Sequence, residues 1–343
     1  MNVHRMTARL GAAFALAAII AAGPSMDKAK ADDAANTLLN ASYDVSRELY
    51  KDINRAFIED WKQKTGNTIT VNQSHGGSTK QALAVANGLE ADVVTFNQAP
   101  DIEVLVKPGL VSSEWRKEFP NDAAPYTTIS VFLVRKGNPK GIKDWEDLVK
   151  PGIEVIVPNP KTSGNGRYTY LAAWGHALKK SGTDEGAKDF VTKLFANVPI
   201  LDGGGRGATT TFTQRDQGDV LVTFENEAKL IGDEVGGDKF EIVYPSTSVV
   251  ADPPVAIINP VVDKHGTRKL AEAYLNFLYS PAGQEIIAKH GLRPRNPDVL
   301  KANAAVFPAV NTFRVEDLLG GWDAVKKNHF ADGANYDQII VKQ

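Results

Sequence analysis

The regular alternation of strand-like and helix-like segments is the feature that most constrains the fold of this chain. Short apolar runs typical of buried strands lie at 37–43, 68–71, 91–96, 127–137, 153–158, 198–201, 219–224 and 240–245. Helical patterns lie at 49–66, 79–89, 100–109, 144–149, 169–180 and 281–291. Such alternation predicts an α/β fold in which helices cover mostly parallel sheets.

Two turn-rich segments, 120–125 (PNDAAP) and 246–254 (STSVVADPP), indicate places where the chain passes between two lobes. We therefore expect a two-lobed protein with a cleft. Lobe I would comprise residues 32–120 and 250–343, and lobe II residues 121–249. The C-terminal motifs TFRVEDLLGGW and NHFADG predict helices that wrap lobe I.

Residues 1–31 have the parts of a secretory signal peptide. A basic start precedes an apolar run at 10–22, which is too short to span a bilayer comfortably. Residues 29–31 (AKA) fit an A-x-A cleavage site, so we expect cleavage near Ala31 and export to the periplasm. A retained membrane anchor is the alternative.

Charge and cysteine content exclude several classes of function. The whole chain has a net charge of −2, and loss of residues 1–31 would make it about −5, so no nucleic-acid surface is expected. The chain has no cysteine, which excludes a disulfide and a thiol-linked lipid anchor. We expect a soluble monomer that needs no cofactor.

Patterns for catalysis or metal binding are weak. The six histidines, at positions 4, 75, 176, 265, 290 and 329, form no H-x₃-H pair. The chain contains neither a Walker-type phosphate loop nor a G-x-S-x-G nucleophile. His75 borders a glycine-rich loop, where we expect a structural role rather than a general base. The sequence therefore favours a binding protein over an enzyme.

Three glycine-rich junctions between a strand and a helix form the candidate site. Their sequences are SHGGS (74–78), TSGNG (162–166) and GGGRG (203–207). A helix N-terminus carries partial positive charge and unpaired N–H groups, and glycine lets a ligand approach the backbone closely. Because ligands of α/β sheets bind beyond the carboxyl ends of the strands, the junctions predict an anion site.

Two other interpretations of these junctions stay open. Glycine and serine also form ordinary short loops and helix caps. The run GGGRGA formally fits the dinucleotide pattern G-x-G-x-x-A, although it lies in mid-chain after a short strand. The occurrence of three junctions in one chain favours the anion site.

The loops also indicate which anion would fit. Ser78, Ser163, Asn165 and the glycine N–H groups are hydrogen-bond donors, and GGST and TSGNG contain no Asp or Glu. A protonated phosphate needs an acceptor for its O–H, whereas ionised sulfate only accepts. A site made of donors alone therefore favours the fully ionised anion.

Three charged residues accompany the junctions. Arg167 and Arg206 are expected to tie helix ends together, with direct contact to the anion as the alternative. Asp44, in SYDVSREL, is expected to cap a helix, with a bracing role in the cleft as the alternative.

Seven ordered motifs carry a family resemblance: LNASYDVSREL, QSHGGSTKQAL, FLVRKGNP, NPKTSGNGRYTYLAAWG, GRGATTTF, YLNFLYSPAGQEI and GGW…HFADG. From Leu38 to Ile340 the chain resembles the periplasmic sulfate- and thiosulfate-binding proteins of ABC transporters. The resemblance implies a type II periplasmic binding protein fold, with a hinged cleft between two Rossmann-like lobes. It also implies a dehydrated oxyanion held by neutral donors without a metal, and delivery to an ABC transporter permease.

The resemblance assigns the ligand-binding residues position by position. On the first lobe it assigns Ser78 as the serine that binds the anion. It places the Ser163 hydroxyl and the N–H groups of Gly164 and Asn165 at the second junction, and the N–H of Gly205 at the third.

One position departs from the sulfate-specific pattern. Sulfate-specific members carry a tryptophan before ENEA, where this chain has Phe224, which cannot donate a hydrogen bond. Phe224 resembles the thiosulfate-binding branch, and we expect both anions to bind. Another tetrahedral oxyanion, such as molybdate or phosphate, and an enzyme on the same fold are the alternatives.

Overall fold

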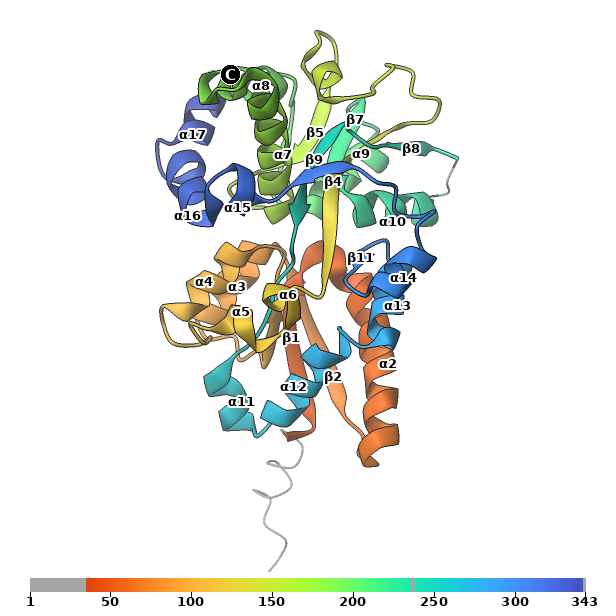
Figure 1. The fold of residues 1–343 in the computed structure, drawn as a ribbon, viewed down its shortest axis with the longest axis vertical. Coiled ribbons are helices and arrows are strands. Elements are labelled where there is room, and N and C mark those ends of the chain that lie inside the picture. The colour runs from red at the N-terminus through yellow and green to blue at the C-terminus, as the bar shows by residue number, and fades with distance from the viewer. Residues whose placement is uncertain (1–34, 236–237, 342–343) are drawn as a thin grey trace, which may run out of the picture.

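The computed structural model describes residues 35–235 and 238–341, so the signal peptide expected at 1–31 lies outside the described residues. The described chain forms two α/β lobes that lie one below the other along the long axis of Figure 1. The two-lobed α/β architecture predicted from the sequence is therefore confirmed. None of the helices in this part of the chain is long and apolar enough to cross a membrane.

Lobe I, the lower lobe in Figure 1, contains a sheet of four described strands in the order β10-β3-β1-β2. Strands β1, β2 and β3 run parallel, and β10 is antiparallel to β3. The strands are β1 (Thr37–Tyr43), β2 (Thr70–Gly76), β3 (Val93–Thr95) and β10 (Val255–Ile257). The helices are η1 (Asp44–Ser46), α2 (Arg47–Thr65), α3 (Ser78–Ala86), α4 (Ala99–Val106), α5 (Trp115–Glu118), α6 (Pro120–Ala123), α11 (Asn259–His265), α12 (Arg268–Phe277) and α13 (Pro281–Lys289).

Helix α2 shows how the apolar periodicity produces the core of lobe I. Leu49, Ile53 and Phe57 recur at every fourth residue, and all three are buried. Phe57 packs edge-on against Tyr274 of α12, with ring centroids 5.2 Å apart. The helix ends at Gly66, whose φ of 76° is the left-handed conformation that glycine adopts without strain.

Lobe II contains a sheet of eight described strands around the long strand β4 (Tyr126–Arg135). The main path is β12-β9-β4-β7-β5-β6, and β8 and β11 also pair with β4. The other strands are β5 (Val155–Pro158), β6 (Leu201–Asp202), β7 (Val220–Phe224), β8 (Phe240–Val243), β9 (Thr247–Ala251), β11 (Arg293–Pro294) and β12 (Asn311–Phe313). The helices are η2 (Trp145–Val149), α7 (Gly164–Ser181), α8 (Asp184–Ala196), α9 (Gly205–Thr213) and α10 (Glu225–Val235). This sheet is mixed rather than mostly parallel, because β4 runs antiparallel to β7, β8, β9 and β11.

The described chain crosses between the lobes three times rather than at two places. The first two crossings, into β4 and from β9 to β10, match the turn-rich segments found in the sequence. The third runs from β11 through α14 (Pro297–Ala302) to β12. Asp252 ties the second crossing to the third, because it accepts a hydrogen bond from Arg295 Nη2 at 2.5 Å and forms an ion pair with Arg314 Nη2 at 3.1 Å.

The C-terminal segment lies on lobe II, so the prediction that all of 250–343 belongs to lobe I is wrong for this segment. Strand β12 pairs with β9 of lobe II, and α15 (Val315–Leu318), α16 (Gly321–Val325), η3 (Lys326–Phe330) and α17 (Asn335–Ile340) follow it. Phe313 and Ile339 are buried in the same apolar core as α7. Gly175 of α7 makes this packing possible, because a Cβ atom there would lie 2.6 Å from Cε1 of the Phe313 ring and nearer still to its Cζ.

Candidate functional site

All three glycine-rich junctions lie together where the two lobes meet. A Cβ atom on Gly77, just before α3 of lobe I, would lie 3.4 Å from the carbonyl oxygen of Thr162, just before α7 of lobe II. A Cβ atom on Gly205, at the start of α9, would lie 3.2 Å from Asn165 Nδ2 on α7. The N-termini of α3, α7 and α9 therefore converge on one region between the lobes.

The start of α7 presents backbone donors to this region. Gly164 and Asn165 are the first residues of the helix, so their N–H groups have no helical carbonyl one turn earlier. Ser163 is the N-cap, and its Oγ accepts a hydrogen bond from the N–H of Gly166 at 3.3 Å. The side chain of Asn165 donates to Thr223 Oγ1 of β7 at 2.9 Å, so its backbone N–H is the donor that this residue offers.

The start of α3 presents a buried hydroxyl group. Ser78 is the first residue of α3 and is 1% exposed. Its Oγ accepts a hydrogen bond from the N–H of Asn97 at 3.2 Å, and its O–H interacts with the buried carboxylate of Asp101.

Asn97 is a residue of this region that the sequence did not reveal. It is buried, and its Oδ1 has no hydrogen-bond partner among the described residues. Its amide lies against the second junction, because a Cβ atom on Gly164 would be 2.6 Å from Asn97 Nδ2. Its position just after β3, at the carboxyl end of a parallel strand, is the signal that would have identified it.

The start of α9 is held by Asp44 of lobe I. Asp44 Oδ1 accepts from the N–H of Val45 at 3.1 Å, and its Oδ2 accepts from the N–H of Arg206 at 3.5 Å. Gly205 lies between these groups, since a Cβ atom there would be 3.0 Å from the Val45 side chain. Burial raises the pKa of Asp44, and the N–H donors oppose this shift.

Arg206 connects the third junction to both lobes. Its Nη2 lies 2.7 Å from Glu48 Oε2 of α2, and its Nε lies 3.6 Å from Glu227 Oε1 of α10. Glu227 is fully buried, and it also accepts a hydrogen bond from Thr209 Oγ1 at 2.8 Å. Burial raises the pKa of Glu227 to about 7.

Arg167, in the first turn of α7, is held without a direct ion pair in the described part of the chain. Its Nε is buried without a hydrogen-bond partner there, and its guanidinium carbon lies 4.9 Å from the ring centroid of Phe330. Burial lowers the pKa of Arg167, and the charge of Asp101 opposes this. Asp101 in turn accepts hydrogen bonds from Thr79 Oγ1 and Gln98 Nε2, both at 2.9 Å.

Phe224 is a packing residue in this structure. It ends β7 and is 1% exposed. Its ring lies 5.8 Å from the ring of Tyr168 on α7, centroid to centroid. The position therefore contributes a buried apolar ring and no hydrogen-bond donor.

The histidine beside the first junction is bonded within lobe I. His75 Nδ1 lies 3.1 Å from the carbonyl oxygen of Tyr43, and its Nε2 lies 2.5 Å from Gln73 Oε1. Burial lowers the pKa of His75. Across residues 35–235 and 238–341, no group of three or more His, Asp or Glu side chains could hold a metal ion.

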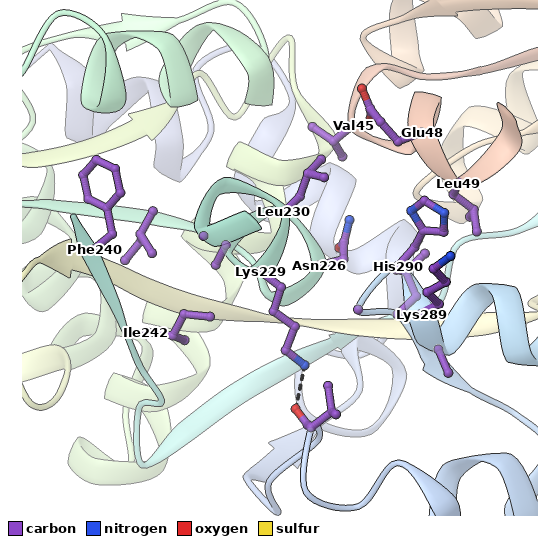
Figure 2. Close-up of a pocket in the computed structure, with 17 residues that line it drawn as sticks. Val45, Glu48, Leu49, Asn226, Lys229, Leu230, Phe240, Ile242, Lys289 and His290 are labelled. Atoms are coloured by element: carbon purple, nitrogen blue, oxygen red, sulfur yellow. Dashed lines mark hydrogen bonds between the residues drawn. The ribbon is translucent and has the colours of Figure 1, made fainter. Parts of the chain in front are cut away.

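A cavity of about 850 Å³ adjoins the third junction between the lobes, where Val45 and Glu48 line it (Figure 2). Its walls come mainly from α10, β8, the start of α2 and the end of α13. Its lysine is already engaged, because Lys229 Nζ bonds to Glu225 Oε1 at 3.1 Å and to the carbonyl oxygen of Val306 at 2.6 Å. The cavity is far larger than a tetrahedral oxyanion and largely apolar, so we place the candidate anion site at the junctions instead.

Comparison with known proteins identifies the family. A family model described as "Bacterial extracellular solute-binding protein" matches residues 45–293. A thiosulfate-binding protein of Pseudomonas aeruginosa is 56% identical over 94% of this chain and 97% of that protein. A sulfate-binding protein of Escherichia coli is 53% identical over 88% of this chain and 92% of that protein.

The fold agrees with these sequence matches. The solved structure of the sulfate-binding protein SubI of Mycobacterium tuberculosis has a TM-score of 0.77 and 33% identity, covering 85% of this chain and 98% of that one. The resemblance indicated by the seven motifs is thereby confirmed. The chain belongs to the bacterial extracellular solute-binding proteins, in the group formed by the sulfate- and thiosulfate-binding proteins.

Proposed function

We propose that the protein binds sulfate and thiosulfate between its two lobes and delivers the anion to the membrane permease of an ABC importer. Its relatives are named for the same two anions. The observation that carries the proposal is the convergence of the N-termini of α3, α7 and α9 between the lobes. Three helix ends supply partial positive charge without a cation, which suits an anion stripped of its water.

In this proposal the anion is held by five neutral donor residues: Ser78, Ser163, Gly164, Asn165 and Gly205. The two serines would donate through their hydroxyl groups and the other three through backbone N–H groups. Each such bond to a buried charge is worth about 1.5–3 kcal/mol. Asp44, Arg206 and Arg167 would hold the helix ends in place, and Phe224 would form an apolar wall.

The surroundings of the donors support selectivity for a fully ionised anion. Two carboxylates, Asp44 and Asp101, lie next to donor residues, but both already accept hydrogen bonds on each oxygen. An O–H of protonated phosphate would therefore meet carboxylates that are already engaged, and the acceptor without a partner beside Gly164 is the amide Oδ1 of Asn97 rather than a carboxylate. We expect sulfate and thiosulfate to be preferred over phosphate.

Calorimetric titration with sulfate, thiosulfate, phosphate and molybdate tests the proposal. We expect sulfate and thiosulfate to bind, and phosphate to bind at least about tenfold more weakly than sulfate, about 1.4 kcal/mol. Phosphate binding within tenfold of sulfate would contradict the selectivity, and no binding of any of these anions would contradict the function.

Alanine variants of two helix-capping serines provide a test of the site and its matched control. Ser163 and Ser280 each cap a helix by accepting from the N–H three residues later, at 3.3 Å and 3.1 Å. Ser163→Ala should weaken anion binding about tenfold or more, because a buried charge loses a donor. Ser280→Ala should cost about 1 kcal/mol of stability without changing affinity. Equal affinities for the two variants would exclude Ser163 from the site.

Two alternative functions are addressed by the same measurements. A binding protein for molybdate would show that preference in the titration. An enzyme on this fold would convert the anion, whereas we expect mass spectrometry to recover the added anion unchanged after long incubation. The naming of its relatives as binding proteins supports a non-catalytic role.

We also propose that the protein acts in the periplasm as a monomer, without a nucleic-acid partner, after cleavage near Ala31. The extracellular family and the sequence of residues 1–31 support export. N-terminal sequencing of protein released by disruption of the outer membrane should begin near Asp32. An intact Met1 on that protein would contradict the cleavage.

A further inference from the structure

The sequence GGW at 320–322 produces a sharp turn in the C-terminal segment. Gly320 and Gly321 have φ of 74° and 85°, both in the left-handed region that residues with side chains rarely adopt. Helix α15 ends at Leu318, and α16 begins at Gly321. The two glycines therefore reverse the chain so that Trp322 enters the space between the lobes.

Trp322 touches both lobes, although the segment that carries it is docked on lobe II. Its ring packs against the apolar cores of lobe I and of lobe II. It also lines a groove of about 860 Å³ together with Pro100 and Val104 of α4. In Figure 1, α16 lies on the side of lobe II that faces α3 and α4 of lobe I.

Trp322 is also linked to the candidate anion site through Tyr168. The Trp322 and Tyr168 rings meet edge to face, with centroids 5.4 Å apart and planes at 89°. On another side, Tyr168 contacts Phe224 at 5.8 Å. Tyr168 belongs to α7, only a few residues after its first N–H donors.

We propose that Trp322 is a positioning residue that stabilises the closed arrangement of the lobes and, through Tyr168, holds the start of α7 and the Phe224 wall in place around the anion. This inference rests on the function proposed above. Separation of the lobes would remove Trp322 from α4, so its contact with lobe I belongs to the closed form alone. Loss of the ring should therefore speed release of the anion more than it slows capture.

The test is the rate of sulfate dissociation, measured by stopped flow, for the wild type, Trp322→Ala, Trp322→Phe and Ile339→Ala. Large aromatic contacts at the centre of an interface often account for about a tenfold change or more, so Trp322→Ala should raise the dissociation rate about tenfold. Trp322→Phe keeps an aromatic ring and should stay within about threefold of the wild type. Ile339 is buried in lobe II alone, so Ile339→Ala should lower the melting temperature and leave the dissociation rate unchanged.

A second readout uses fluorescence and does not depend on the alanine variant being folded. The chain has five tryptophans, and Trp322 is the one whose ring packs against the apolar cores of both lobes, while Trp115 of lobe I lines a small pocket beside it. We expect sulfate to change the intrinsic fluorescence of the wild type and to change that of Trp322→Phe much less. Retention of the full change in Trp322→Phe would overturn the inference.

The outcomes separate this inference from the proposed function. If the wild type binds neither sulfate nor thiosulfate, the proposed function is wrong. If the wild type binds but Trp322→Ala releases sulfate at the wild-type rate, or Ile339→Ala releases it equally fast, the function stands and the role of Trp322 is wrong.

Discussion

The side-chain amide of Asn97 on lobe I lies directly against Gly164 on lobe II. A Cβ atom at position 164 would be 2.6 Å from Asn97 Nδ2 and nearer still to its Oδ1. Asn97 also donates its backbone N–H to Ser78 Oγ at 3.2 Å. The two lobes thus meet at the candidate donors themselves, and position 164 tolerates no side chain while they do.

Gly164→Ala should therefore weaken anion binding without unfolding the protein. The added methyl group must displace Asn97 or keep the lobes apart, and overpacking of this kind costs about 1–3 kcal/mol. We expect the dissociation constant for sulfate to rise about ten- to hundredfold in calorimetric titration.

Gly232→Ala is the matched control for this substitution. Gly232 lies in α10 with no atom within 4 Å of an added Cβ, and alanine is favoured over glycine in helices. This variant should bind sulfate like the wild type. A Gly164→Ala protein with the wild-type dissociation constant would show that the lobes do not close as described.

The ion pair between Arg206 and Glu48 should contribute modestly to affinity. It joins the lobes at 2.7 Å, but both side chains are about one third exposed, at 31% and 33%. Pairs screened in this way are worth about 0.2–1 kcal/mol, so Glu48→Gln should raise the sulfate dissociation constant by at most about fivefold.

A double-mutant cycle isolates this pair from the other contacts of Arg206. The variants are Glu48→Gln, Arg206→Gln and the combination of both, titrated at low and high salt. The coupling energy should be positive and should shrink as salt increases. Additive effects of the two substitutions would show that the pair does not help to close the lobes.

Local patterns in the sequence were sufficient to find the fold class and the three junctions. Each junction depends only on a strand, a few small residues and the helix that follows. Ser78, Gly164 and Gly205 are the first residues of the helices α3, α7 and α9 that follow the three junctions. Strand β2 begins at Thr70, close to the predicted run 68–71, and continues to Gly76.

Features that depend on contacts between distant segments were missed. Asn97 gains its position only because lobe I meets Gly164 of lobe II. The C-terminal segment belongs to lobe II because the ring of Phe313 fits against Gly175, more than a hundred residues earlier. No local pattern of charge or hydrophobicity distinguishes such a glycine from one in an ordinary helix.

Glu227 should make the stability of the protein depend on pH. Burial raises its pKa from 4.5 to about 7, so the folded state binds a proton that the unfolded state releases between these values. This stabilisation is fully present below about pH 4.5 and is lost as the pH rises through about 7. A pKa shift of this size changes the free energy of unfolding by about 3 kcal/mol at most.

Urea unfolding of the wild type and Glu227→Gln between about pH 5 and pH 8 tests this pH dependence. Glutamine keeps an acceptor for Thr209 but cannot titrate, so the stability of the wild type should fall with rising pH relative to the variant. Other titrating groups contribute equally to the pH dependence of both proteins, so their contributions cancel in the comparison. His329, whose pKa is lowered to about 4 by burial, is an example. Parallel curves for the two proteins would show that Glu227 does not titrate in this range.

Phe224→Trp should shift the preference of the protein from thiosulfate towards sulfate. The phenyl ring ends β7 against Tyr168 and offers no donor, whereas an indole would add one N–H. Sulfur is a poorer acceptor than the oxygen it replaces, so the new donor favours sulfate, by about 1.5–3 kcal/mol where geometry allows. The larger ring also costs about 1–3 kcal/mol in a position that is 1% exposed. Both anions bear this packing cost equally, so the measurement is the ratio of the two dissociation constants.

Phe224→Leu is the control, because it changes the packing without adding a donor and should leave the ratio unchanged. An unchanged ratio in Phe224→Trp, or equal shifts in both variants, would show that Phe224 packs the core of lobe II without setting the choice of anion.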